Sequence, residues 1–547
     1  GDAAQLVGEA SRKLREEDFV GALRLLEQAV AADPRNPAAN VLYQDTTRKL
    51  LGVGELVTRY KTLAAESPDD PLLAYLSARL LEPADAALAF ERQATRFKDS
   101  PWPHVGHARA LQLLGKPGDA VAALERAVLV AGSDPSFKAM QAYALESADN
   151  HAAAADAWKR VLEARPDDPT ARIGLGEALR RNGNGAEAIA AFEAAAKADP
   201  KDPDPLCRIG LVHLEAQRFD EARKAFDAAL GLNRSMVEAL CGAAEAVLRK
   251  ALAEAVAKNA AEDETLLKEA LDYAARADAS NPESARAHFV LGSVYEALGE
   301  NDALHLESAL AEHQKSIDLL PFPGPARVRS LVAKSYVLLR LARWDEAEAV
   351  AKQALDIDEA NIPALLHAGH ALCQTGKYDD AIRKYYKPGL KVAKDDGRIL
   401  YAYGMASWGD KKHNDAKKQL ESAVDAEPRN GLYRMSLGEL HYELKRYKEA
   451  VKELAIAVEE RPNDPQAWRS YGRACTSADL WDEAAKAFEK TCELDEEALD
   501  EWLYLAIIYS DHLKDRKTAK ARLEKFLELG GYDDNLESWI EELLAEE

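Results

Sequence analysis

The sequence predicts an all-α protein made of about fifteen successive helix pairs. Three recurring features support this prediction: a 34-residue period, a small residue within each first helix, and proline pairs at helix ends. The 547 residues are 47% hydrophobic and 30% charged, close to the composition of soluble globular domains. A repeat array therefore replaces the three or four separate domains that the length alone would suggest, at roughly 150 residues each.

The period is set by an alanine on each second helix. Seven of the fourteen intervals in this series are 34 residues long, and Leu56 alone replaces the alanine. The alanines are Ala22, Ala87, Ala120, Ala154, Ala188, Ala222, Ala270, Ala309, Ala347, Ala381, Ala416, Ala450, Ala484 and Ala519. The regular spacing predicts that one supersecondary unit is repeated along the chain.

A small residue stands twelve positions before the alanine in the uninterrupted repeats. Glycine within a helix costs about 1 kcal/mol relative to alanine, so its recurrence requires a packing reason, and we expect close approach of two helix backbones. The glycines are Gly176, Gly210, Gly369, Gly404, Gly438 and Gly472. Bulky residues four positions after the alanine are Trp158, Phe192, Phe226, Tyr385 and Phe488. They predict an apolar stripe along the second helix.

Pairs of prolines three residues apart follow several amphipathic segments and mark helix ends. They stand in DPRNP (33–37), SPDDP (67–71), RPDDP (165–169), DPKDP (199–203) and RPNDP (461–465). Proline disrupts a helix interior because it lacks an N–H group and its ring crowds the preceding turn. The proline pairs therefore separate one helix pair from the next.

Together these features resemble the tetratricopeptide repeat (TPR) family. The resemblance is clear in RIGLGEALRRNGNGAEAIAAFEAAAKADP (172–200) and in WRSYGRACTSADLWDEAAKAFEKTCELDE (468–496), and it covers nearly the whole chain. It is weakest at 35–99, where the glycine is missing. The resemblance implies a right-handed superhelical α-solenoid of antiparallel helix pairs, in which the first helix of each pair lines a concave groove.

The repeat spacing predicts four regions. Residues 1–234 form an N-terminal arm of about seven repeats with 35–99 degenerate, and 235–325 form a seam of irregular repeats. Within the seam, 247–271 is rich in Ala, Leu, Lys and Glu, which predicts prolonged helices. Residues 326–531 form a C-terminal arm, and 532–547 an acidic capping helix. The seam is either a hinge or docking element, or a drifted repeat without either role.

Composition and motifs argue against enzyme activity and against nucleic-acid or membrane binding. The net charge of −23 and the pI near 5.1 disfavour nucleic-acid and anionic-membrane partners, and no apolar run approaches the ~20 residues of a membrane helix. No phosphate-binding glycine loop, CxxC, GxSxG or HExxH motif is present. His104 with His107 and His367 with His370 form HxxH pairs, but zinc requires three or four ligands. We therefore expect no enzyme activity, no cofactor and no metal.

The family's geometry places residues three before, one after and four after the small residue on the concave face. In the C-terminal arm these positions, and one beside them, gather aromatic, Met, His and Arg side chains, which are typical of peptide-binding surfaces. The predicted groove residues are Tyr336, Leu366, His367, His370, Tyr401, Met405, Trp408, Met435, Tyr442, Arg469 and Arg473. The alternative is that these side chains pack against neighbouring repeats.

The resemblance implies a non-enzymatic scaffold or adaptor that binds an extended or helical partner segment in the groove. The alternative is a regulatory TPR arm of a kinase or glycosyltransferase whose catalytic domain lies outside this chain. The Lys and Asn carboxylate clamp of chaperone-binding members and the asparagine ladder of glycosyltransferase-linked members are both absent.

Expected partners are proteins or peptides, with a complex subunit or self-association also possible. Five cysteines, an odd number, indicate reduced thiols rather than a disulfide framework. The N-terminus does not resemble a signal peptide. These features favour a cytoplasmic protein, with a periplasmic or otherwise exported one as the alternative. The absence of an initial Met leaves open that sequence precedes Gly1.

Overall fold

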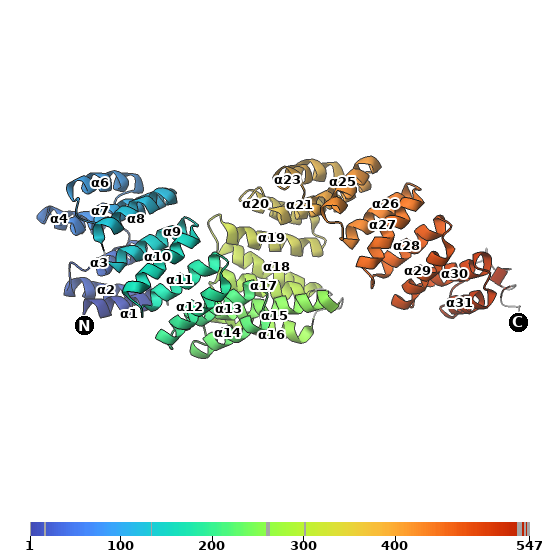
Figure 1. Cartoon of the computed structure of the whole chain (residues 1–547), viewed down its shortest axis with the longest axis horizontal. Coiled ribbons are helices and arrows are strands. Elements are labelled where there is room, and N and C mark those ends of the chain that lie inside the picture. The colour runs from blue at the N-terminus through green and yellow to red at the C-terminus, as the bar shows by residue number, and fades with distance from the viewer. Residues whose placement is uncertain are drawn as a thin grey trace. The chain divides into compact units, whose positions relative to one another are not determined.

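A computed structural model describes residues 2–15, 18–132, 134–258, 263–299, 302–532, 539, 540 and 543. All regular elements in this described part of the chain are helices, which confirms the predicted all-α class (Figure 1). Contacts divide the chain into two compact units, Gly1–Gly242 (unit 1) and Ala243–Glu547 (unit 2). The boundary falls within α15 (Val237–Lys258), and each unit is described by itself.

Unit 1 consists of seven antiparallel helix pairs, in each of which an odd-numbered helix is followed by an even-numbered one. The helices are α1 (Ala3–Arg15), α2 (Phe19–Ala32), α3 (Pro37–Leu51), α4 (Gly54–Glu66), α5 (Pro71–Ala78), α6 (Pro83–Arg96), α7 (Trp102–Leu113), α8 (Pro117–Ala131), α9 (Pro135–Ser147), α10 (His151–Ala164), α11 (Pro169–Arg181), α12 (Gly185–Ala198), α13 (Asp204–Glu215) and α14 (Phe219–Leu232).

Unit 2 continues the succession of helices after α15. Its helices are α16 (Glu264–Ser280), α17 (Ala285–Leu298), α18 (Ala303–Asp318), α19 (Pro325–Arg340), α20 (Trp344–Leu355), α21 (Ile362–Gln374), α22 (Tyr378–Ala381), η1 (Ile382–Tyr386), α23 (Lys387–Val392), α24 (Gly397–Gly409), α25 (His413–Ala426), α26 (Gly431–Glu443), α27 (Tyr447–Glu460), α28 (Pro465–Ser477), α29 (Trp481–Leu494), α30 (Leu499–Ile507), η2 (Ile508–His512) and α31 (Arg516–Glu528).

The proline motifs begin helices as well as end them. In SPDDP, Pro71 is the first residue of α5, and the Asp70 carboxylate accepts a hydrogen bond from the Leu72 N–H at 2.9 Å. Asp168 caps α11 in the same way before Pro169. Proline suits the first helical position because that N–H has no intrahelical partner. In these two motifs the second Asp-Pro step therefore fixes where the first helix starts.

The core lies between the helices of each pair and between successive pairs. Every alanine of the predicted series is fully buried except Ala87, which is half-exposed. In that repeat Ala86 is buried instead, so the sequence assignment was wrong by one residue. The physical reason is that α5 has only eight residues and Tyr75 in place of a small residue, so the usual spacing does not apply.

The glycines of the first helices make room for a large side chain of the second helix. A Cβ on Gly176 would lie 2.5 Å from the Phe192 ring, and Gly210 and Gly472 face Phe226 and Phe488 in the same way. The bulky residue sixteen positions after the glycine thus sits directly on it. At these three glycines the close neighbour is a ring and not the expected backbone, whereas a Cβ on Gly404 or Gly438 would also lie 3.3 Å from a backbone atom of the second helix.

One repeat departs from this register because of a π-helical turn. Tyr386, rather than the predicted Tyr385, covers Gly369. Within η1 the Lys387 N–H donates to the Ile382 carbonyl five residues back, which inserts one extra residue. Pro388 has no N–H for the usual bond to the carbonyl four residues back, and this accounts for the wider turn.

Tight turns between the paired helices share a left-handed residue. Lys445, between α26 and α27, has φ of 58°, and Gly376, between α21 and α22, has φ of 73°. Non-glycine residues occupy this conformation also at Asp149, Gln217, Ala342, Lys411, Asp479 and Lys514. A single left-handed residue therefore reverses the chain direction in most repeats.

The predicted prolonged helices are present in α15 and α16, which have 22 and 17 residues. At the far end of α15, Val256 is 84% exposed. Most of the predicted capping helix at 532–547 lies outside the described residues, but Ile540 and Leu543 are buried against Leu523 and Phe526 of α31. These two side chains cover the last repeat.

Candidate functional site

The predicted groove residues lie on five first helices of unit 2: α19, α21, α24, α26 and α28. Tyr336, His370 and Arg473 are exposed, and the others are partly buried. Contacts join α19 to α21, α21 to α24, and α26 to α28. Side-chain bonds described below join α24 to α26, so the set forms one connected surface.

At α19 and α21 the surface is uncharged. Ser335 Oγ lies 2.8 Å from His367 Nδ1, and the rings of Tyr336 and His367 are 5.7 Å apart. Burial, with a contribution from nearby His370, lowers the pKa of His367 to about 4. The His367 ring is therefore neutral at pH 7. Leu366, beside it, packs against the core between α21 and its neighbours.

Aromatic residues connect α24 to α26. The Tyr401 ring stacks on Tyr433 with 4.9 Å between centroids, and its hydroxyl lies 3.3 Å from Ser436 Oγ. The Trp408 indole N–H donates to the Glu443 carboxylate at 2.7 Å. Met405 packs beside them against the core of this repeat. The polar ends of both aromatic side chains are thus bonded while their rings stay partly exposed.

A cation–π contact continues the surface from α26 to α28. The Arg473 guanidinium lies 5.3 Å from the centroid of the Tyr442 ring, and the Tyr442 hydroxyl accepts a hydrogen bond from Ser477 at 3.4 Å. Met435 packs against Leu454 and its buried neighbours. Arg473 is the exposed cation of the predicted set.

Arg469 differs from Arg473 because its charge is already compensated. Its Nε atom donates to Glu501 at 2.6 Å, and one terminal nitrogen lies 3.4 Å from Asp495. Glu501 is buried, so this pair ties α28 to α30 within the core. The guanidinium of Arg469 therefore has a structural role between two repeats.

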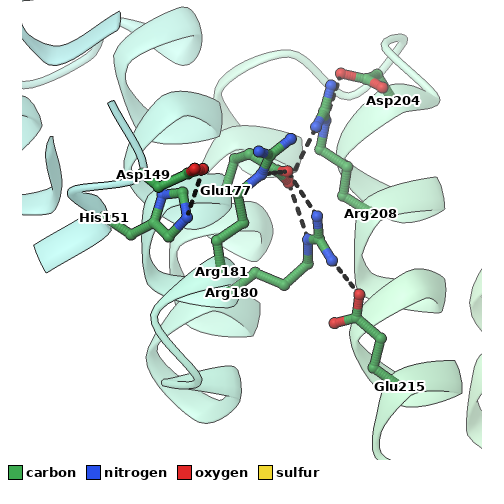
Figure 2. A network of polar contacts seen from close by, with 8 residues as sticks. All are labelled: Asp149, His151, Glu177, Arg180, Arg181, Asp204, Arg208 and Glu215. Atoms are coloured by element: carbon green, nitrogen blue, oxygen red, sulfur yellow. Dashed lines mark hydrogen bonds and ion pairs between the residues drawn. The ribbon is translucent and has the colours of Figure 1, made fainter. Parts of the chain in front are cut away.

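Unit 1 carries a polar network that the sequence analysis did not select (Figure 2). Glu177, one residue after Gly176, accepts hydrogen bonds from Arg180 at 2.7 Å and Arg181 at 2.9 Å, and pairs with Arg208 at 3.3 Å. Arg180 also pairs with Glu215. The position of Glu177 directly after Gly176 was the signal that could have selected it. Its pairing with Arg208, 31 residues later, cannot be predicted from the pattern of a single helix.

Burial alone would raise the pKa of Glu177, but the hydrogen bonds from Arg180 and Arg181 hold it at about 2. Arg208 adds a further attractive charge. Glu177 is consequently a carboxylate at all physiological pH values, and the network joins α11 to α13.

Two family models, both of tetratricopeptide repeats, match parts of the chain. A tetratricopeptide repeat family model matches residues 139–203 and 207–272, and a second tetratricopeptide repeat model matches 407–474. The chain is a tetratricopeptide repeat protein. TPR proteins bind other proteins, and TPR scaffold families are generally non-catalytic.

A curated relative of this TPR protein is the BBSome complex member BBS4 of Bos taurus, 23% identical over 252 residues. The match covers 46% of this chain and 47% of BBS4, so the chain spans less than half the length of that relative.

Two solved structures are similar to this TPR protein. The APC/C hetero-tetramer Cut9–Hcn1 is 14% identical with a TM-score of 0.46, covering 100% of this chain and 96% of that one. YrrB, described as a TPR protein with an unusual peptide-binding site, is 22% identical with a TM-score of 0.30, covering 33% and 91%.

Within the described residues of the TPR protein, no group of three His, Cys, Asp or Glu side chains could hold a metal ion. No described helix is both long and apolar enough to cross a membrane.

Proposed function

We propose that this TPR protein is a scaffold that holds an extended or helical segment of a partner protein against α24, α26 and α28. The observation that carries the proposal is the row of Trp408, Tyr442 and Arg473, which follow one another across the three helices. Aromatic rings and arginine are the side chains that dominate protein-binding energy at interfaces.

The arrangement of these side chains supports a preorganised surface. Trp408 is held by Glu443 and Tyr442 by Ser477, so little rotamer freedom is lost when a partner covers the rings. Binding surfaces that are ordered beforehand spend less free energy on ordering during association. Met405 and Met435 beside the rings add flexible apolar contacts that adapt to a partner's shape.

Of the two arginines expected from the sequence, Arg473 is the better candidate for contacting a partner. Arg469 is occupied by Glu501 and Asp495, whereas Arg473 is exposed above Tyr442. In the proposed surface, Tyr336, Leu366, His367 and His370 on α19 and α21 extend the same face towards the N-terminal side. Their neutral, half-apolar character suits an apolar part of the partner segment.

The test uses Trp408→Ala in the full chain. A partner is first captured on the wild-type protein and identified by mass spectrometry, and its affinity for each variant is then measured. Removing a desolvated aromatic anchor should cost about 2 kcal/mol or more, roughly a thirtyfold loss of affinity. The melting temperature should change little, because the Trp408 ring is only partly buried.

The matched control is Trp468→Ala. Trp468 lies on α28, one of the three helices of the proposed surface, but it does not belong to the predicted groove residues. Its indole N–H donates to the Pro462 carbonyl at 2.8 Å. This variant should retain affinity. A large fall in melting temperature with unchanged affinity in Trp408→Ala would show that the ring is part of the core, and the proposal would be rejected.

A further inference from the structure

The degenerate repeats of unit 1 contain a buried arginine. The Arg79 side chain, just after α5, is completely inaccessible to solvent. It donates to Gln44 at 2.6 Å and to both oxygens of Asp45 at 3.0 and 3.1 Å. Gln44 occupies the place of the small residue in α3, and its side-chain amide donates to the Leu76 carbonyl. Repeats that lack the glycine therefore contain a polar network between α3 and α5.

Asp45 is shared by two arginines. Both terminal nitrogens of Arg109 in α7 also donate to the Asp45 carboxylate, with nitrogen to oxygen distances of 2.9 and 3.3 Å. Burial opposes ionisation of Asp45, but the bonds from Arg109 and Arg79 outweigh it and lower its pKa. One carboxylate thus serves two guanidinium groups, and its acceptor sites are used.

A third arginine in this cluster lacks an acidic partner. Arg48, one turn after Gln44 on α3, donates only to the Arg79 carbonyl at 3.3 Å, and its buried Nε has no hydrogen-bond partner. No carboxylate of the described residues lies within ion-pair distance of it. Burial and the charges of Arg109 and Arg79 lower its pKa, although Asp45 and, more weakly, Glu82 attract it from beyond ion-pair distance. An anion from outside the chain would compensate this charge.

The same face exposes two large apolar side chains. Leu51 stands three residues after Arg48 on α3 and is 75% exposed. Leu113 stands four residues after Arg109 on α7 and is 61% exposed. Residues three or four apart are neighbours on a helix surface, so each partly exposed arginine has an exposed leucine beside it.

We propose that this face of α3, α5 and α7 binds a partner segment that carries an acidic side chain next to a large apolar one. The carboxylate accepts hydrogen bonds from Arg48, beside the positive charge of Arg109, and the apolar side chain packs against Leu51 or Leu113. This site lies in unit 1 and shares no residue with the surface proposed above in unit 2. A positive cluster on a protein of net charge −23 gives local selectivity for an acidic segment.

The test uses three capped, fluorescein-labelled peptides of one design, in which Glu-Leu pairs are spaced by Gly and Ser. In the second peptide Gln replaces Glu, and in the third phosphoserine does. Fluorescence anisotropy with the full chain should show binding of the Glu peptide that weakens as salt is added. Equal binding of the Gln peptide, phosphopeptide binding without Glu-peptide binding, or no Glu-peptide binding up to about 1 mM would overturn the proposal.

Arg48→Gln should weaken binding of the Glu peptide at least tenfold. The matched control, Arg92→Gln, removes the same charge from an exposed position on α6 and should leave affinity within about twofold. Arg48→Gln should fold normally because the side chain makes only one hydrogen bond, and circular dichroism checks this. Unchanged affinity in folded Arg48→Gln would reject the site.

A second variant and a labelling experiment keep the test independent of folding. Leu51→Ser, at a largely exposed position, should weaken binding several-fold without changing the melting temperature. A photoreactive leucine in the Glu peptide should crosslink to α3 or α7, and the Trp408→Ala chain should be labelled equally. Crosslinking only to unit 2 would contradict the assignment.

Discussion

At Gly176 the fully buried Phe192 ring occupies the space that any side chain would need. Gly176→Ala should therefore destabilise the protein, although alanine has the better helix propensity by about 1 kcal/mol. Overpacking a core typically costs about 1–3 kcal/mol, which leaves a net loss of up to about 2 kcal/mol. Urea unfolding followed by circular dichroism measures this change.

The control for this substitution is Gly231→Ala in α14. A Cβ at Gly231 would meet nothing within 4 Å, so only the propensity gain remains, up to about 1 kcal/mol of added stability. Opposite signs in the two variants are the expected result. Stabilisation by both would mean that Phe192 moves aside without cost.

The Glu177 network predicts a specific sensitivity to acid. The folded pKa of about 2 lies below the ordinary value of 4.5, so the carboxylate contributes stability above pH 4.5 that is lost as the pH falls towards 2. Because solvent partly screens the network, the contribution should lie between about 1 and 3 kcal/mol. Glu177→Gln should remove most of it at pH 7.

Urea unfolding of the wild type and of Glu177→Gln at pH 7 and pH 3 tests this prediction. The stability difference between the two proteins should be largest at pH 7 and should shrink at pH 3. A difference that does not depend on pH would show that Glu177 acts through packing rather than through its charge.

Among the elements, the left-handed turns offer a simple test of backbone strain. A side chain in the left-handed region costs roughly 1–2 kcal/mol, partly offset by the greater freedom of glycine in the unfolded chain. Lys445→Gly should therefore raise stability by about 0.5–1 kcal/mol, because Lys445 has φ of 58° and is exposed.

The reverse substitution, Gly376→Ala, serves as the matched control. A Cβ there would touch nothing within 4 Å, so its effect reports the backbone conformation alone, and a loss of about 1 kcal/mol is expected. Thermal unfolding of both variants against wild type gives the two values. Equal melting temperatures for all three would contradict a strained turn.

Features that repeat within one helix pair were predictable from the sequence. The alanine series and the glycine offsets identified the second and first helices because each depends on a contact made in every repeat. The π-helical turn at Ile382–Tyr386 was not predicted, since it inserts one residue into a helix whose alanine keeps the regular 34-residue spacing. The shift from Ala87 to Ala86 was not predicted because α5 is shortened in this one repeat.

The candidate surfaces were predictable only where they depend on position within a helix. Trp408, Tyr442 and Arg473 were selected by their offset from a glycine, and they do connect successive first helices. The pairing of Arg469 with Glu501, and the cluster around Asp45, join residues 32 to 64 positions apart. Such pairs form only when repeats stack on one another, and the residue pattern of a single helix does not show which side chains of the next repeat will lie opposite.

At the scale of the whole molecule, each helix pair contacts mainly its neighbours in sequence, so local changes should stay local. Deleting residues 252–265, which lengthen α15 and α16 beyond the 34-residue repeat, should leave the rest of the chain folded. Adding Ala251→Gly supplies the left-handed residue that the shortened turn needs. Exposure of Leu252 and Val256 shows that this end of α15 is not core.

Circular dichroism and differential scanning calorimetry of the deletion variant test this expectation. Helical content per residue should be unchanged, and the main unfolding transition should move by only a few degrees. Loss of all helical structure in one step would show that the segment supports the fold.

Because almost all packing joins residues close in sequence, the chain need not be finished before it begins to fold. A ribosome adds about 5–20 residues per second, so a new 34-residue repeat emerges every few seconds. Helix formation and loop closure take microseconds or less, which leaves ample time for each pair to settle on the one before it. The protein can thus assemble from its N-terminus during synthesis, each finished repeat serving as the template for the next.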